Sequence, residues 1–397
     1  MKFVVKTKDV MLDTLRVAMC GGELKFKTKE SITDERLVEL FNMSAKLDVV
    51  QIVADVLLKN NLIENSEIRN IYKETLMGTV MRVEQIKHEF SRICAVFEES
   101  GISYIPLKGA AIRDFYPETW MRNSCDIDIL IKPCDLERAI KLLFENFNCS
   151  DFKKNSCDVA MDTESGVHIE LHYKLLDKDI LKNGKYLRKW DFDLLSDIWE
   201  TAQVFRGEKY HYVMNDALFY CYHFAHMAKH FENGGCGIKA IVDLWVIDNL
   251  KEYDRQKREE YLKKAKLLSF YKHMSQLCRV WFADEEKNDM TEMLENYILS
   301  GGAYGSLKNK VTFGSSKAGN NNNFLKHRIF ASADVLRCYY PKIDEKKWLM
   351  PFCQIGRWFK IIKAGRLKKS VNEIVMSKNV SADDFEFAKM LAEKLGL

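Results

Sequence analysis

The spacing of hydrophobic residues divides the chain into three regions, 1–99, 100–212 and 213–397. In the first region apolar residues recur every three or four positions, as at Leu37 and Leu40, and the same spacing returns in the third. This period is typical of helices that bury one face. The central region instead has short apolar runs between polar turns. We therefore expect an α+β protein in which N-terminal and C-terminal helical regions flank an α/β core with a small mixed sheet.

The central region predicts strands and helices in alternation. A strand–helix–strand–helix order comes first, and two further strands then form a hairpin around a polar turn. The expected elements are strands at 102–107 and 127–131, helices at 110–115 and 135–147, and hairpin strands at 158–161 and 167–173. Asp135 is of a residue type that caps helix N-termini, so we expect it to cap the second helix.

The composition favours a globular cytoplasmic protein. Of the 397 residues, 47% are hydrophobic and 30% charged, which allows more than one core, and the net charge of +4 is too small to indicate nucleic-acid binding. Eleven cysteines without a CxxC pair indicate neither a disulfide framework nor a thiolate zinc site. Charges interrupt the N-terminal apolar run too early for a signal peptide, and no segment is apolar for long enough to span a bilayer.

Asp126 and Asp128 are the first candidates for chemistry. Alternate residues of a strand share one face, so these carboxylates converge while Ile127 and Ile129 face the other side. Paired carboxylates repel each other unless a cation lies between them, and hard oxygen ligands suit Mg²⁺ or Mn²⁺. The same pattern also occurs in solvated turns. The run Ile-Leu-Ile directly after Asp128 favours a buried strand instead.

The second strand of the predicted hairpin supplies further polar side chains. His168, Glu170 and His172 share one face of this strand, and apolar residues occupy the other. Glu170 is therefore placed to complete a carboxylate triad with Asp126 and Asp128 across neighbouring strands.

Lys108 and Gly109 lie where the first expected strand passes into a helix. Glycine permits a tight turn and close approach of a ligand, and the amides of Ala110 and Ala111 at the helix start would point at an anion. Lys108 would add a positive charge to this site. A purely structural turn explains the same residues, and the chain has neither a Walker loop nor a GxGxxG motif.

In order along the chain, these motifs resemble the uncharacterised nucleotidyltransferase family of the DNA polymerase β superfamily. The residues that carry the resemblance are the runs 107–117, 126–131 and 169–172, with Arg122, His226 to His230, Asp243 and the region 339–357. The resemblance covers most of the chain after about residue 70.

The resemblance implies a metal-dependent enzyme that moves a nucleoside monophosphate from a nucleoside triphosphate to a hydroxyl of a small-molecule, sugar or peptide acceptor. Asp126, Asp128 and Glu170 would bind two Mg²⁺ or Mn²⁺ ions when substrate is present. Glu170 would also help to deprotonate the acceptor, and the turn at Gly109 would lie against the triphosphate. Arg122 would contact the triphosphate or the acceptor; an ion pair that orients Asp126 is the alternative.

The phosphate turn departs from the pattern of the superfamily. The superfamily usually has Gly-Ser or Gly-Gly there, whereas Lys108, Gly109 and Ala110 offer no hydroxyl group. A non-catalytic nucleotide-binding or protein-interaction module that keeps the fold is therefore the alternative function. A transferase that acts on RNA is a third hypothesis.

His223, His226 and His230 fall on one stripe of an expected helix. Three imidazoles in line are compatible with zinc, but the chain lacks both the HExxH and the His-Asp patterns. We instead expect these histidines and Asp243 to join helices or line a cleft above the core. Of the histidines, His172, His226 and His230 are the predicted substrate contacts.

Two stretches of the C-terminal region have unusual composition. Residues 301–323 are rich in Gly, Ser, Lys and Asn, which predicts a mobile loop. Residues 357–369 are basic and amphipathic, a pattern that nucleic acid or a membrane surface could bind. A helix that packs Trp358, Ile361 and Ile362 inward explains the same pattern, and this interpretation is preferred. We therefore expect neither a membrane nor a nucleic-acid partner.

Overall fold

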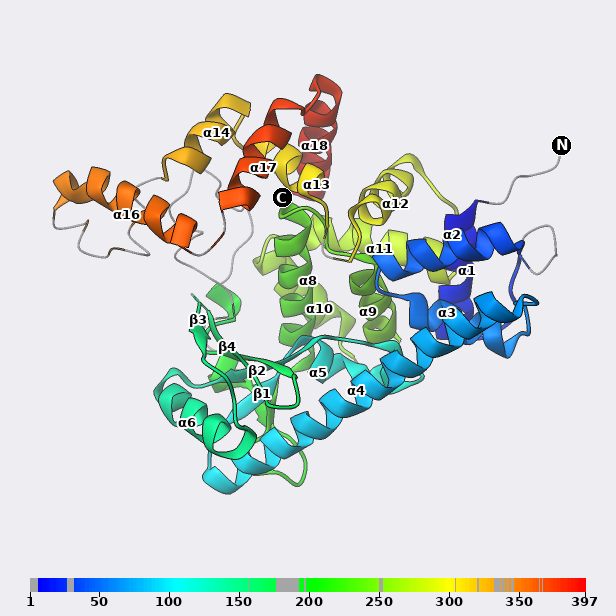
Figure 1. Cartoon of the computed structure of the whole chain (residues 1–397), viewed down its shortest axis with the longest axis horizontal. Helices are drawn as coiled ribbons and strands as arrows, with labels where there is room; N and C mark the ends of the chain where they lie inside the picture. Colours follow the sequence, from blue (N-terminus) through cyan, green and yellow to red (C-terminus); the bar gives the residue numbers. More distant parts are fainter. Residues whose placement is uncertain are drawn as a thin grey trace.

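The computed structural model combines a small sheet with a larger assembly of helices (Figure 1). It describes residues 6–26, 32–155, 157–175, 193–195, 198–249, 253–303, 305–319, 321–331, 336, 340, 343, 346–363, 365 and 367–397. The expected α+β class is confirmed. No helix in these ranges has an apolar stretch long enough to cross a bilayer.

Four helices precede the sheet: α1 (Thr7–Cys20), α2 (Asp34–Lys46), α3 (Val50–Lys59) and α4 (Ser66–Ser100). The long helix α4 begins where the Asn65 side chain accepts hydrogen bonds from the amides of Glu67 and Ile68, and it ends at Gly101, whose φ is +67°. Tyr72 near its start is buried against the other N-terminal helices, whereas Phe97 near its end is buried against the sheet. Helix α4 therefore connects two hydrophobic cores.

The main sheet has five strands in the order β1-β2-β5-β4-β3. Strands β2 and β5 pair in parallel, and the other neighbours are antiparallel. The predicted hairpin is confirmed as the pair β4 and β5. The strands are β1 (Tyr104–Pro106), β2 (Asp126–Ile131), β3 (Lys153–Lys154), β4 (Asp158–Asp162) and β5 (His168–His172), and β6 (Gln203–Val204) and β7 (Tyr212–Val213) form a separate ribbon.

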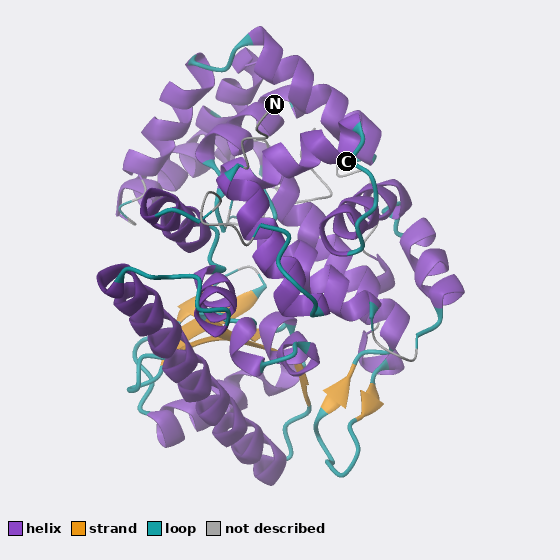
Figure 2. Ribbon diagram, turned by 90° about the vertical axis from the view of Figure 1, so that its right-hand side faces the viewer, coloured by secondary structure: helices purple, strands orange, loops and turns teal. Residues whose placement is uncertain are grey.

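The two faces of the main sheet have different partners. Ile127, Ile129 and Ile131 of β2 pack with α4 and with α6 (Leu136–Phe147) in one core. Asp126 and Asp128 point to the opposite face, as the alternation predicts. Figure 2 shows the strands between α4 and the larger helical assembly. Asp135 does not cap α6, because it belongs to a short 3₁₀ turn and its side chain makes no capping hydrogen bond.

The C-terminal helices share their core with the N-terminal ones. Side chains of α1 and α3 lie in the same hydrophobic cluster as those of α8, α9 and α11. The remaining helices are α5 (Lys108–Ile112), α7 (Ile198–Thr201), α8 (Asp216–Glu232), α9 (Ile238–Asp248), α10 (Arg255–Lys264), α11 (Leu268–Phe282), α12 (Asp289–Gly301), α13 (Leu307–Lys317), α14 (Asn321–Ile329), α16 (Met350–Lys363), α17 (Leu367–Lys378) and α18 (Ala382–Leu395).

Two expectations for the C-terminal region are wrong. The stretch 301–323 contains α13, which begins where the Ser306 hydroxyl accepts a hydrogen bond from the Asn309 amide and which buries Val311 and Phe313. These apolar anchors outweigh the loop-like composition around them. Helix α16 forms as expected, but Ile362 is 54% exposed and does not pack inward. Trp358 does contact the protein, because its Nε1 donates to the carbonyl of Ile329 and its ring lies against that of Phe330.

Candidate functional site

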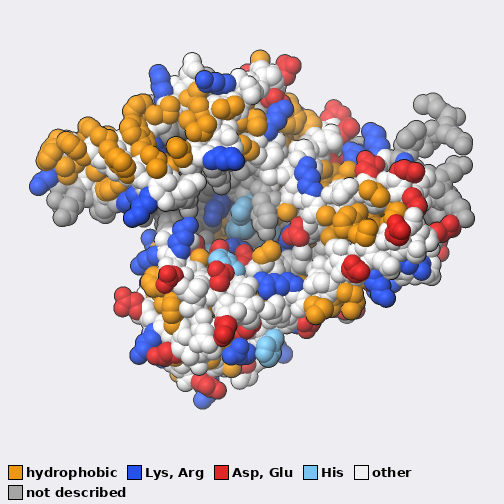
Figure 3. All heavy atoms as spheres, viewed as in Figure 1, with side chains coloured by type: hydrophobic (Ala, Val, Ile, Leu, Met, Phe, Trp, Pro, Cys, Tyr) orange, Lys and Arg blue, Asp and Glu red, His pale blue; other side chains and the backbone are white. Residues whose placement is uncertain are grey.

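A cavity of about 400 Å³ lies between the polar face of the sheet and helices α8 and α9. Figure 3 shows this hollow beneath the C-terminal helices, with histidine side chains inside it. Strands β2 and β5 contribute acidic groups, and the helices contribute basic ones. The lining includes Asp126, Asp128, Glu170 and His172 from the strands and Lys108, Gly109, Arg122, Tyr222, His223, His226, Lys229, His230, Lys239 and Asp243 from the other segments.

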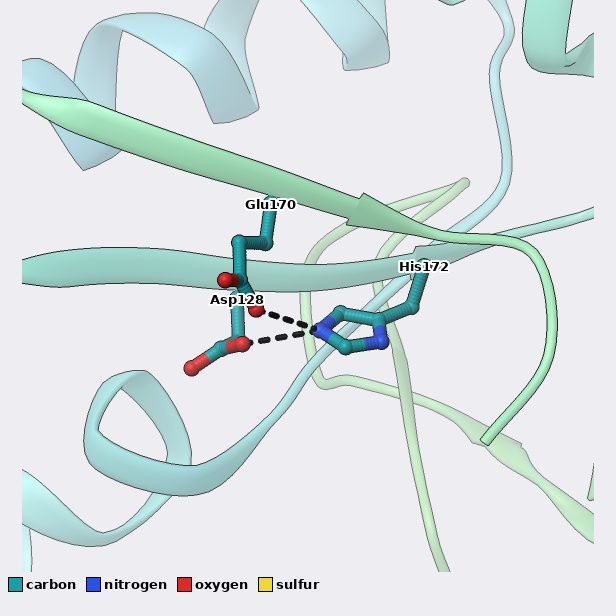
Figure 4. A group of neighbouring side chains, drawn as sticks. All are labelled: Asp128, Glu170 and His172. Atoms are coloured by element: carbon teal, nitrogen blue, oxygen red, sulfur yellow. Dashed lines mark hydrogen bonds and ion pairs between the residues drawn. The ribbon is translucent and has the colours of Figure 1, made fainter. Parts of the chain in front are cut away.

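Asp128, Glu170 and His172 all line this cavity, and their side chains point toward one another (Figure 4). The parallel register places Asp128 opposite Glu170. The Nε2 atom of His172 lies 2.8 Å from Oδ1 of Asp128 and 3.3 Å from Oε2 of Glu170. One ligand atom from each residue lies within 4.8 Å of the others, which is close enough for one cation to contact all three.

Asp126 lines the same cavity outside this group of three. It lies opposite His168 on the neighbouring strand, two residues before the position where Asp128 lies opposite Glu170. Burial, together with the charge of Asp128, raises the pKa of Asp126 above its ordinary value. The structure thus places the two expected carboxylates Asp128 and Glu170 together, with His172 nearer to them than Asp126 is.

Lys108 brings a positive charge directly to the carboxylates. Its Nζ donates a hydrogen bond to Oδ1 of Asp128 at 2.7 Å and lies 3.7 Å from Oε2 of Glu170. Lys108 has a left-handed backbone with a φ of +47°, which costs a residue with a Cβ roughly 1–2 kcal/mol. The strained backbone position therefore belongs to Lys108 and not, as expected, to Gly109.

The ionisation of the group follows from burial and from these short contacts. Burial alone would raise the pKa of Asp128, but the Lys108 ammonium and the hydrogen bond with His172 lower it below its ordinary value. Burial would lower the pKa of His172, but its hydrogen bonds with Asp128 and Glu170 raise it. The Lys108 ammonium and the hydrogen bond with His172 therefore favour the ionised form of Asp128.

The glycine turn is built differently from the predicted anion site. The amide of Ala110 is not free, because it donates to the carbonyl of Leu107 at 3.1 Å, and Ala110 does not line the cavity. Gly109 does line it and packs closely against the next segment, since a Cβ there would lie 3.3 Å from both Cβ and Oγ of Ser124. A side chain at position 109 would therefore crowd Ser124, and glycine avoids this crowding.

Arg122 forms an ion pair that neither sequence interpretation anticipated. Its Nε donates to Oδ1 of Asp243 at 2.6 Å and its Nη2 donates to Oδ2 at 2.9 Å, so the partner is on α9 and is not Asp126. The Tyr116 hydroxyl donates to the same Oδ1 at 2.6 Å. The guanidinium borders the cavity, but its bidentate pair with Asp243 fixes its position.

His226 and His230 line the cavity as expected, and their Nε2 atoms are 3.1 Å apart. Burial, followed by the neighbouring His230 and Lys108, lowers the pKa of His226 well below its ordinary value. His223 contacts the carbonyl of Ala240 at 3.4 Å instead of joining the pair. Within the described ranges the histidine stripe forms no group with metal-ligand spacing.

The model of the family described as "Uncharacterised nucleotidyltransferase" matches residues 34–283, well over half of the chain. The chain belongs to this family. No curated protein and no solved structure matches it. The matched residues run from α2 to the end of α11 and include every residue that lines the cavity except Ala303.

Four residues that line the cavity had no motif that would reveal them. Lys229 and Lys239 add positive charge on α8 and α9, Tyr222 adds a buried hydroxyl, and Ser124 meets Gly109. The Lys239 ammonium also donates to Asp48. Helical spacing places Tyr222 and Lys229 on the same face of α8 as His226, and this spacing is the only signal that could have pointed to them.

The donor set of this site fits a divalent cation. Asp128 and Glu170 provide hard oxygen ligands, and His172 provides Nε2 as a nitrogen ligand when that atom carries no proton. The position of the Lys108 ammonium shows that the site already favours positive charge. Lys108 and a metal ion would therefore compete for Oδ1 of Asp128.

Proposed function

We propose that this nucleotidyltransferase moves a nucleoside monophosphate from a nucleoside triphosphate to a hydroxyl of a small-molecule, sugar or peptide acceptor. The observation that carries the proposal is the Asp128–Glu170 pair at the sheet end of a cavity whose helical wall is basic. Its volume of about 400 Å³ lies in the range of pockets that bind small molecules. The opposite charges of the two walls suit a metal-bound triphosphate.

Asp128, Glu170 and His172 would hold Mg²⁺ or Mn²⁺, with Asp126 beside them for a second ion. Such ions neutralise phosphate charge when they are bound with the substrate. Lys108, Lys229 and Lys239 then face the triphosphate from the cavity walls and hold it by charge attraction.

Transfer requires one bond to form and one to break. The acceptor oxygen bonds to the α-phosphorus, the bond between that phosphorus and the oxygen bridging to the β-phosphate breaks, and pyrophosphate leaves with the electron pair. The acceptor proton passes to Glu170. Glu170 suits this role because its side chain is 27% exposed, whereas that of Asp128 is 3% exposed. His226 and His230 border the space left for the acceptor.

Calorimetry with a nucleoside triphosphate and Mn²⁺ tests the site. We expect the paired substitution Asp128→Asn with Glu170→Gln to weaken metal-dependent binding at least tenfold, because both acidic ligands are lost. The control is Asp162→Asn, which removes a carboxylate outside the cavity on the neighbouring strand β4. Unchanged binding by the paired variant would refute the site.

A non-catalytic nucleotide-binding module is the second candidate. It is favoured by the Lys108 ammonium between the carboxylates and by the Ala110 amide, which is already bonded within the chain. Assays of pyrophosphate release with a broad panel of hydroxyl acceptors separate the two functions. Tight triphosphate binding without any release of pyrophosphate supports the module.

A further inference from the structure

Helix α16 carries a stripe of exposed hydrophobic side chains outside the family match. The residues of the stripe are spaced by four and three positions and therefore share one side of the helix and of the turn before it. They are Trp348, Phe352, Ile355, Phe359 and Ile362, and each is between 45% and 68% exposed. Figure 3 shows hydrophobic side chains covering the projecting helix that Figure 1 labels α16.

The opposite side of α16 is fixed to the protein. The Nη2 atom of Arg357 and the Nε1 atom of Trp358 both donate to the carbonyl of Ile329, at 2.7 and 3.0 Å. Gln354 donates to the carbonyl of Ala331. The other side of α16 is therefore hydrogen-bonded to the protein, and the stripe faces outward.

Positive charge is concentrated on the same segment. Between residues 346 and 378 there are nine Lys or Arg residues and one acidic residue, Glu373, which is buried and accepts a hydrogen bond from Lys310. This segment has a net charge of +8, whereas the whole chain has +4, so the remainder is net negative. Lys363 and Lys368 are exposed and follow Ile362, the last residue of the stripe, in the sequence. The basic character of the protein thus comes from the part that also exposes aromatic side chains.

We propose that α16 and the adjoining start of α17 bind the surface of an anionic lipid bilayer. Exposed Trp and Phe side chains enter the boundary between headgroups and acyl chains, while flanking lysines contact anionic headgroups. The net positive charge of residues 346–378 favours an anionic bilayer over a neutral one. Three of the five stripe residues are aromatic, which is typical of interfacial helices, whereas helix-pairing seams favour aliphatic residues. The helix lies on the membrane and does not span it.

Vesicle sedimentation of the full chain tests the hydrophobic part of the surface. The wild-type protein is expected to bind vesicles of phosphatidylcholine mixed equally with phosphatidylglycerol, and to bind pure phosphatidylcholine much more weakly. Phe352→Ser with Phe359→Ser should lower partitioning by roughly a hundredfold, because the bilayer no longer buries two aromatic side chains. The matched control is Phe115→Ser with Phe152→Ser, which removes two exposed phenylalanines elsewhere and should leave binding unchanged.

The charged part is tested with Lys363→Gln and Lys368→Gln together. Each lysine near an anionic surface contributes about 1 kcal/mol, so we expect roughly a thirtyfold loss and a weaker dependence on salt. Lys73→Gln with Lys141→Gln is the control for exposed lysines outside the segment. Equal binding to both vesicle types, or no binding to either, would overturn the proposal. A concentration-dependent dimer that Phe352→Ser with Phe359→Ser abolishes, in the absence of vesicle binding, would assign the stripe to a second copy of the chain instead.

Discussion

The ion pair between Arg122 and Asp243 gives a stability prediction that can be worked from its geometry. Two N–H···O contacts of 2.6 and 2.9 Å join the residues, and their side chains are only 12% and 5% exposed. The Tyr116 hydroxyl shares one of the carboxylate oxygens. Replacing Asp243 by Asn keeps the shape of the side chain but leaves the buried guanidinium without a counter-charge.

We expect Asp243→Asn to lower the free energy of unfolding by about 3–5 kcal/mol, the range for loss of one partner of a buried ion pair. The exposed pair of Lys264 and Glu260, whose side chains are 55% and 56% exposed, is the control. Glu260→Gln should cost less than about 1 kcal/mol, because water screens the charges and the side chains lose entropy on pairing.

Urea denaturation followed by circular dichroism measures both changes. Adding Arg122→Met to Asp243→Asn should restore part of the stability, because the unpaired buried charge is then removed. A loss below about 1 kcal/mol for Asp243→Asn would refute the reasoning. An Arg122→Lys variant that keeps its stability but binds the triphosphate tenfold more weakly would also refute it. Such a result would mean that Arg122 acts mainly as a phosphate ligand and not as the partner of Asp243.

Three further predictions concern single positions. Lys108→Met should strengthen Mn²⁺ binding in calorimetry about tenfold, because Oδ1 of Asp128 loses a competing cation 2.7 Å away; unchanged or weaker binding would contradict this competition. Gly109→Ala should lower the free energy of unfolding by about 1–3 kcal/mol in urea, since the new Cβ crowds Ser124; a neutral effect would show that the turn can move. Burial would raise the pKa of Glu295, but hydrogen bonds from Lys287, Lys8 and Trp281 lower it. The ionised Glu295 therefore stabilises the fold fully above its unfolded-state pKa. This stabilisation is lost as the pH falls through the lower pKa of the folded state. Unfolding measured at pH 7 and below pH 4 should therefore show Glu295→Gln to be destabilising at the higher pH and much less so at the lower.

Much of the local structure could be predicted because local spacing determines it. Alternation alone places Ile127 and Ile129 on one face of β2 and Asp128 on the other, and the same rule groups Glu170 with His172 on β5. The ordered motifs then indicate the family. The parallel pairing of these strands brings the groups together, as expected for neighbouring strands.

Partners that are distant in the sequence could not be predicted from spacing. The choice of Asp243 over Asp126 as the partner of Arg122 depends on where α9 packs, 121 residues farther along the chain. The exposure of Ile362 depends on whether another element covers α16, and amphipathic spacing is the same in either case. Composition failed at α13 for a related reason, because two buried apolar residues and a capping serine hold a helix among loop-forming neighbours.

Lys108 shows why the position of a charge is harder to predict than its presence. Its place before Gly109 suggests a side chain that faces phosphate, yet its ammonium contacts Asp128 and Glu170. In the absence of a metal ion, the buried carboxylate of Asp128 requires a counter-charge, which Lys108 provides while His172 adds a hydrogen bond. A metal ion that took over that role would leave the same ammonium available to a triphosphate. The position that the sequence suggests for Lys108 and the position that the structure shows would then be two states of one substrate-dependent side chain.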